Sequence, residues 1–228
     1  MAVGVLGLVG GGEWNEGFTF DAYLLERSGS KEVTILRTAA AYERPDLAVA
    51  HATRWFSKLG ASVSTAMVIT RPDARDPSFA QMLADSSFIY IGGGSPLHLF
   101  SVLKHSQCYE AIVNAFSNGA VLAASSAGAM VLGDPMIDPR GGGIMLGLGL
   151  IKELAVLPHY STTSLELKQR IQSLTDPAVV IAGLDEETAL IREADGSWNA
   201  MGTGSVHLVS NGAELDISAL SEKVRISV

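Results

Sequence analysis

Apolar runs alternate with amphipathic segments along most of the chain. Runs rich in apolar and β-branched residues predict strands at residues 3–9, 33–36, 63–69, 88–91, 121–124 and 154–157. Segments between them predict helices at residues 18–27, 45–59, 77–84, 97–103, 109–116 and 164–174. This alternation is typical of a parallel sheet with helices on both faces. We therefore predict one α/β domain spanning residues 1–228.

The last third of the chain has a different pattern. Short runs at residues 179–184, 188–192, 198–201 and 206–209 are separated by turns. They predict a largely antiparallel extension of the same sheet.

Three loops of small residues follow predicted strands. Two are triple glycines, at residues 10–12 and 92–94, and the third surrounds Ser126. The carboxyl ends of parallel strands share one edge of the sheet, where ligands bind. Tight turn geometry alone could explain each triple glycine, but their convergence favours a functional site.

Ser126 lies where a predicted strand turns abruptly into a helix. On such a turn the hydroxyl is exposed, and the backbone N–H of Ala127 points toward whatever the serine attacks. Ala127 and Gly128 are small enough for the turn, although Ala124 replaces the first glycine of the usual elbow pattern. The alternative is a serine that caps a helix.

A serine nucleophile needs a base, and histidine is the usual one near pH 7. Of the five histidines, only His98 and His159 are placed near the predicted strand-end edge. His98 falls inside a predicted helix, whereas His159 directly follows a strand. His159 is therefore the favoured base.

Composition and charge exclude several classes of function. The net charge of −8 and the lack of a lysine and arginine cluster argue against a nucleic-acid partner. The single cysteine, Cys108, allows no internal disulfide. The apolar start of the chain lacks a basic region, so we expect no signal peptide or membrane span and a cytoplasmic protein.

The sequence predicts neither a cofactor nor a metal site. The spacing of Gly4, Gly7 and Gly10 does not match the dinucleotide-binding pattern, and Arg37 stands where an acidic ribose ligand would be expected.

Four segments together resemble one known family. They are Ser126-Ala127-Gly128-Ala129, the triple glycine at residues 92–94, Pro158-His159-Tyr160 and residues 183–189. In this order they resemble the dipeptidase E and cyanophycinase family of serine peptidases, over most of the chain to about residue 192.

The resemblance implies a flavodoxin-like three-layer sandwich related to class I glutamine amidotransferases, with serine in place of their cysteine. It implies Ser126 as nucleophile, His159 as base, and an acyl-enzyme mechanism. The oxyanion hole would come from backbone N–H groups of Ala127 and of the loop at Gly93 and Gly94.

The resemblance also implies an acid in the loop between serine and histidine. Residues 133–143 contain two prolines and three consecutive glycines, so no regular structure is expected there. Asp138 is favoured over Asp134, although either could merely organise a turn. The acidic cluster at residues 185–187 is interpreted as solvated turn carboxylates.

The expected substrates are short peptides, including those with an acidic first residue. Thr163 and Leu165 stand where cyanophycinases carry arginines, so cyanophycin is not expected; Arg140 and Lys168 are the candidate cationic partners. The alternatives are a non-catalytic binding module and an esterase or amidase using the same site. We expect no membrane partner, and a homodimer is left open.

Overall fold

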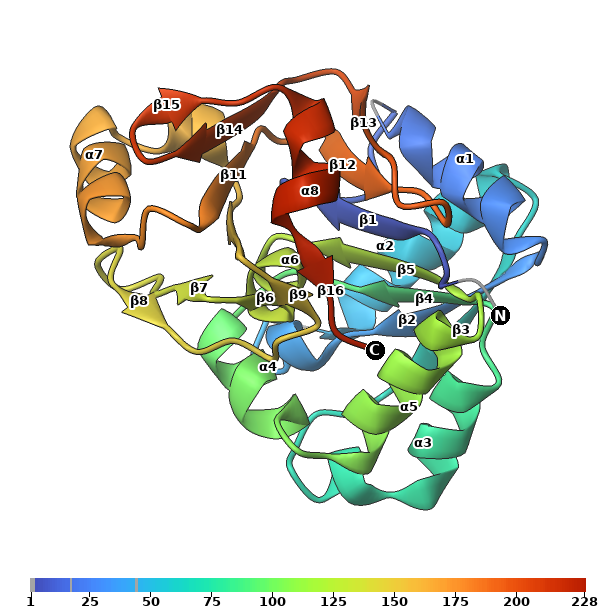
Figure 1. Cartoon of the computed structure of the whole chain (residues 1–228). Coiled ribbons are helices and arrows are strands. Elements are labelled where there is room, and N and C mark those ends of the chain that lie inside the picture. The colour runs from blue at the N-terminus through green and yellow to red at the C-terminus, as the bar shows by residue number, and fades with distance from the viewer. Residues whose placement is uncertain (1–2, 17, 44) are drawn as a thin grey trace.

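A seven-stranded sheet forms the centre of the computed structural model, which describes residues 3–16, 18–43 and 45–228 (Figure 1). Its strand order is β13-β12-β1-β5-β4-β2-β3, and the five strands from β1 to β3 in this order are parallel. β12 is antiparallel to β1, and β13 to β12. The strands are β1 (Leu6–Val9), β2 (Glu32–Leu36), β3 (Ser62–Ala66), β4 (Phe88–Ile91), β5 (Val121–Ser125), β12 (Thr188–Arg192) and β13 (Trp198–Gly202).

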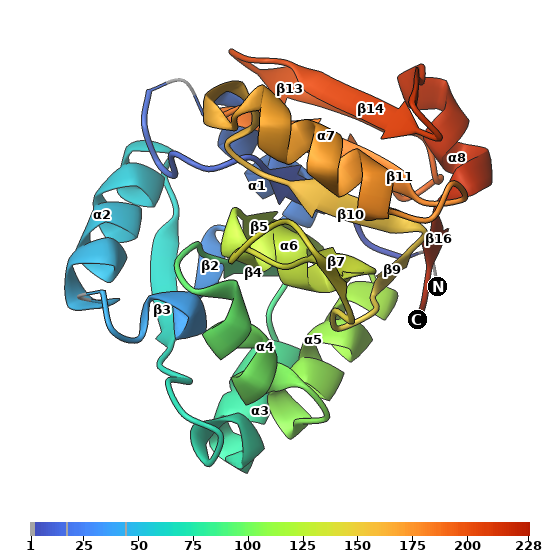
Figure 2. The ribbon, with the colours of Figure 1, turned by 90° about the vertical axis from the view of Figure 1, so that its left-hand side faces the viewer.

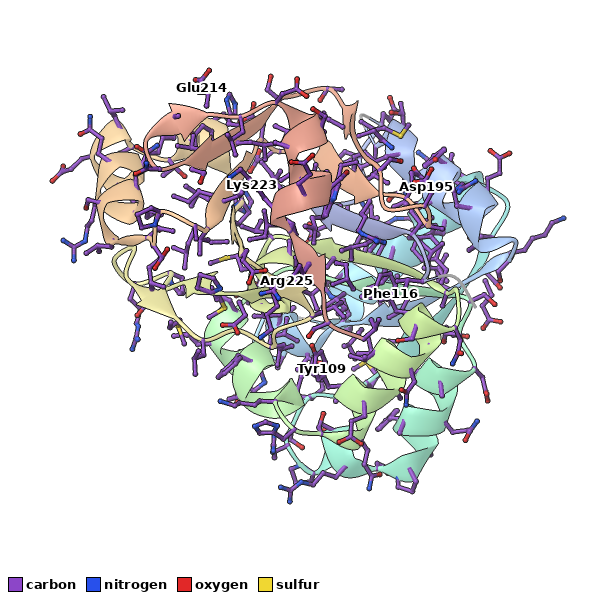
Figure 3. All side chains as sticks on the ribbon, viewed as in Figure 1. Tyr109, Phe116, Asp195, Glu214, Lys223 and Arg225 are labelled. Carbon is purple, nitrogen blue, oxygen red and sulfur yellow. The ribbon has the colours of Figure 1, made fainter. Side chains whose placement is uncertain are left out.

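Helices cover both faces of this sheet. Alternate residues of a strand face opposite sides, and the two apolar cores divide accordingly: Val33 and Ile35 pack with α1 and α2, whereas Leu36 packs with α3 to α6. Phe116 of α5 is fully buried in the second core (Figure 3). The predicted three-layer α/β fold is confirmed. The helices are α1 (Thr19–Ser28), α2 (Pro45–Lys58), α3 (Pro77–Ala84), α4 (Pro96–Leu103), α5 (Gln107–Ser117) and α6 (Ala127–Leu132).

A second sheet of four strands, in the order β10-β11-β14-β15, lies beside α7 (Figure 2). The predicted antiparallel extension of the central sheet is therefore confirmed for β12 and β13 and wrong for β11 and β14, which belong to the second sheet. β11 is parallel to β10, and the turn after β11 carries the chain from the second sheet to the first. The elements are β10 (Leu154–Leu157), α7 (Leu165–Leu174), β11 (Val180–Leu184), β14 (Val206–Ser210) and β15 (Ala213–Glu214).

Short elements complete the structure. Contrary to expectation, the loop at residues 133–143 contains two-residue strands: β6 pairs with β9, and β7 pairs with β8 just after the loop. No helix among the described residues is long and apolar enough to cross a membrane. The short elements are β6 (Gly133–Asp134), β7 (Met136–Ile137), β8 (Ile144–Met145), β9 (Ile151–Lys152), β16 (Arg225–Ile226), α8 (Leu220–Lys223) and the 3-10 turns Thr38–Ala40, Asp73–Arg75, Tyr160–Thr162 and Ile217–Ala219.

One carboxyl group is completely buried in the packing of α1 against α2. Trp55 Nε1 donates a hydrogen bond of 2.8 Å to Asp21 Oδ2. Burial raises the pKa of Asp21 to about 8. Between roughly pH 4 and pH 8 the folded state therefore holds a proton that the unfolded chain releases, so stability falls as the pH rises.

We expect Asp21→Asn to remove this pH dependence. The asparagine is uncharged at every pH and keeps an acceptor for Trp55. At ~1.36 kcal/mol per pKa unit, the shift from 3.8 to about 8 makes the gain over the wild type at pH 9 at most about 6 kcal/mol. Urea denaturation at pH 5 and pH 9 measures the effect, with Glu26→Gln on the exposed face of α1 as control. The same pH dependence in Asp21→Asn and wild type would contradict this account.

Candidate active site

Ser126 joins β5 to α6 in a strained backbone conformation. Its φ of 49° and ψ of −110° lie in a region that costs a non-glycine residue free energy. The turn is closely packed: a Cβ added at Gly128 would lie only 2.6 Å from the carbonyl oxygen of Ile91. Ser126 itself is only partly buried, while both its neighbours are buried. The strain therefore presents the hydroxyl at the carboxyl edge of the central sheet.

His159 follows β10 and reaches the same edge from the second sheet. Its Nε2 lies 3.0 Å from Ser126 Oγ, within hydrogen-bond distance. The imidazole packs against Gly11, where a Cβ would lie 2.2 Å from Cε1 of the ring. The structure thus brings together the serine and the histidine that the sequence singled out.

The carboxylate on the far side of the ring belongs to Glu186. Its Oε1 lies 2.7 Å from His159 Nδ1, and the two side chains are 50% and 41% exposed respectively. If Nδ1 donates to this carboxylate, Nε2 is left as the acceptor for the serine hydroxyl. Ser126, His159 and Glu186 therefore form a hydrogen-bonded chain of three side chains.

The two aspartates favoured from the sequence do not contact His159. Asp138 accepts hydrogen bonds from Arg140 Nε at 2.9 Å and Nη2 at 2.7 Å, and the Arg140 contacts lower the pKa of Asp138 to about 2. Asp134 pairs with Lys152 Nζ at 2.6 Å. The expectation that either aspartate would complete the arrangement is wrong; Glu186, interpreted from the sequence as a solvated turn carboxylate, is half exposed but also contacts His159.

The position of Glu186 follows from the strand directions. Because β10 and β11 are parallel, with Leu157 opposite Gly183, their carboxyl ends lie side by side. His159 comes just after the first and Glu186 just after the second. The carboxyl ends of parallel strands share one edge of a sheet. If β11 had been predicted as parallel instead of antiparallel, this would have placed Glu186 near His159.

Three consecutive carbonyl groups at the end of β1 hold the three loops of the site. Val9 O accepts from Ser126 N, and Gly10 O accepts from His159 N, both at 2.9 Å. Gly11 O accepts from Glu187 N at 3.0 Å. One tripeptide thus fixes the backbone next to each member of the hydrogen-bonded chain.

The expected oxyanion donors lie in two places. Ala127 is the first residue of α6, so its N–H has no acceptor within the helix. Gly93 adjoins the nucleophile: a Cβ there would lie 3.2 Å from Ser126 Cβ. Gly94, at a φ of +132°, packs against the backbone of Ala39.

The N–H of Gly93 already has a partner that the sequence analysis missed. It donates a 2.8 Å hydrogen bond to Glu13 Oε1, a carboxylate 80 positions earlier in the chain. No local pattern marks this contact, because it depends on how the loops after β1 and β4 meet.

Comparison with known proteins places the chain in a family. The model of peptidase family S51 matches residues 6–197. The chain belongs to peptidase family S51. This confirms the family that the sequence motifs indicated.

Curated relatives of this S51 chain include two cyanophycinases. The one from Trichormus variabilis is 28% identical over 194 residues, and the one from Thermosynechococcus vestitus is 27% identical over 196 residues. The matches cover 80% and 81% of this chain but only 65% and 61% of the relatives, so the chain spans just under two thirds of their length.

Two solved structures resemble the S51 chain over nearly its whole length. A peptidase from an acI-B1 Actinobacterium matches with a TM-score of 0.85 and 29% identity, covering 94% of this chain and 93% of the other. A putative peptidase E protein from Listeria monocytogenes EGD-e matches with a TM-score of 0.61 and 20% identity, covering 92% and 99%. The second match supports the fold alone.

The candidate cations of this S51 chain are engaged within the protein. Arg140 is exposed and paired with Asp138. Lys168 Nζ lies 3.7 Å from the centre of the Tyr160 ring, which stacks on His207. Within the described ranges, no three His, Cys, Asp or Glu side chains gather as metal ligands would.

Proposed function

We propose that this protein is a serine exopeptidase that hydrolyses short peptides. The observation that carries the proposal is the 3.0 Å contact between Ser126 Oγ and His159 Nε2 on a strained strand-to-helix turn. Membership of peptidase family S51 and the likeness to an actinobacterial peptidase support it. The activity is proposed for this chain, which is shorter than its curated relatives.

In the proposed reaction, His159 Nε2 takes the proton of Ser126 as Oγ attacks the peptide carbonyl carbon. The carbonyl electron pair moves onto oxygen, which the N–H groups of Gly93 and Ala127 would stabilise. The C–N bond then breaks, and His159 gives its proton to the departing amine. Water attacks the acyl-enzyme, loses a proton to His159, and releases the acid as Ser126 is reprotonated.

Glu186 takes the orienting role in this proposal. Its hydrogen bond to Nδ1 fixes the ring so that Nε2 faces the serine, and its charge stabilises the imidazolium that forms during the reaction. Asp138 and Asp134 are given no part, because both pair with cations of their own loops or strands.

Short peptides fit the site better than cyanophycin. The curated relatives compared above are named cyanophycinases, but here Leu165 is exposed and Thr163 hydrogen-bonds to His159 O. No arginine stands at either position. A distance beyond about 4 Å between Ser126 and any imidazole nitrogen would favour the non-catalytic alternative, and the observed distance is 3.0 Å.

A fluorophosphonate probe and a substrate panel test the proposal. We expect covalent labelling at Ser126, located by mass spectrometry of the digested protein, and hydrolysis of dipeptides such as Asp-Leu and Ala-Leu. An unlabelled protein, under conditions that label a control serine hydrolase, would count against any serine hydrolase. Turnover of p-nitrophenyl acetate without any dipeptide turnover would favour the esterase alternative.

A further inference from the structure

Glu13 lies beside the proposed nucleophile without a role in the mechanism above. It follows the glycine loop at residues 10–12, and its side chain is only partly buried. A Cβ at Gly93 would lie 2.7 Å from Glu13 Oε1 and 3.2 Å from Ser126 Cβ. The carboxylate and the serine side chain therefore flank the same backbone position.

Backbone geometry would bring a peptide's first amino group close to this position. In an N-terminal residue, the amino nitrogen is about 2.5 Å from its own carbonyl carbon, by standard backbone geometry. When that carbon is attacked by Ser126 and its oxygen turns to Gly93, the nitrogen must lie within a few ångströms of both. A free N-terminus is an ammonium group there, and Glu13 supplies the opposite charge.

We propose that Glu13 binds the free α-ammonium of the substrate's first residue and so restricts the enzyme to peptides with an unblocked N-terminus. The proposal rests on the proposed function, since it assigns a substrate group to the same site. A charged hydrogen bond of this kind is stronger than a neutral one. An N-acetylated residue offers no positive charge to this carboxylate.

The hydrogen bond between Glu13 and Gly93 adds a second consequence. In the structure the carboxylate occupies an N–H group that the oxyanion needs. When the substrate's ammonium group binds, the Glu13 carboxylate pairs with it in place of the Gly93 N–H. That N–H is then free to donate to the developing oxyanion. Substrates without the ammonium leave this donor occupied, so Glu13 is expected to affect turnover as well as binding.

Other charged side chains near Glu13 are not placed to bind the ammonium group in its stead. Arg37 is buried and lies under Gly92, where a Cβ would be 2.1 Å from its Nη1. Glu186 is engaged with His159 on the far side of the imidazole. Among the contacts of the described residues, Glu13 is the carboxylate that touches the glycine loop beside Ser126.

The test compares kcat/KM for Ala-Leu and Asp-Leu with kcat/KM for their N-acetyl forms. We expect the wild type to prefer the free peptides by about a hundredfold or more, a preference that Glu13→Gln lowers at least tenfold. The glutamine keeps an oxygen to accept from Gly93 and loses only the charge, so a merely structural role would leave the preference intact. Glu13→Asp keeps the charge and should retain part of the preference for free peptides.

Glu16→Gln is the matched control, because Glu16 is an exposed glutamate of the same loop. It should keep the wild-type preference. Equal rates on free and acetylated peptides in the wild type, or an unchanged preference in Glu13→Gln, would overturn the role of Glu13 while leaving the peptidase proposal intact. A wild type that neither reacts with the fluorophosphonate nor cleaves any peptide would overturn the proposed function itself.

Discussion

Ser126→Ala is expected to lower kcat/KM for dipeptide hydrolysis by at least ~10⁴-fold, because it removes the only atom that can form the acyl-enzyme in the proposed mechanism. Any remaining rate would come from substrate binding and the oxyanion donors acting on water. Steady-state hydrolysis followed by chromatography of the products measures the loss. Labelling by the fluorophosphonate should disappear in the same variant.

The adjacent serine is the matched control. Ser125 is fully buried, one position before Ser126. Ser125→Ala removes the same hydroxyl one position earlier and should keep both hydrolysis and labelling. If Ser126→Ala retained the wild-type rate, Ser126 would be excluded as the nucleophile. If only Ser125→Ala lost labelling, the probe would be reacting at Ser125 instead.

Glu186→Gln is expected to lower kcat by about 10²-fold. Glutamine can still accept from Nδ1 but carries no charge to stabilise the imidazolium. The loss should be smaller than the ~10⁴-fold seen when a buried triad carboxylate is replaced, because Glu186 is half exposed and water screens its charge. The kcat of the purified variant on a saturating dipeptide checks this value.

Two further variants distinguish the contribution of Glu186 to kcat from those of Glu187 and Asp138. Glu187→Gln changes the neighbouring carboxylate, which accepts from Thr203 Oγ1 at 3.2 Å, and should change kcat less than about threefold. Asp138→Asn breaks the exposed pair with Arg140 and should have as little effect. A large loss in Asp138→Asn combined with a small one in Glu186→Gln would show that the hydrogen-bonded chain seen here is not the working one.

The sequence predicted the parts of the site that depend on local turns and on parallel strands. Ser126 and His159 both follow short apolar runs, so their convergence could be deduced from the strand-end rule. Glu186 was missed because β11 pairs in parallel with β10 in a second sheet, whereas an antiparallel extension of the central sheet was predicted, and the choice of pairing partner leaves no periodic signal in a single sequence. Glu13 was missed because its partner, the N–H of Gly93, belongs to the backbone and carries no residue-specific signature.

The tripeptide at the end of β1 ties the chemistry of the site to main-chain spacing. Its three carbonyl groups are successive, so the distance between the serine loop, the histidine loop and the acidic turn is set by the backbone geometry of these three residues. Inserting or deleting one residue there would change the positions of the three loops relative to one another. Outside this tripeptide, in contrast, surface loops could lengthen or change composition without disturbing the spacing on which proton transfer depends.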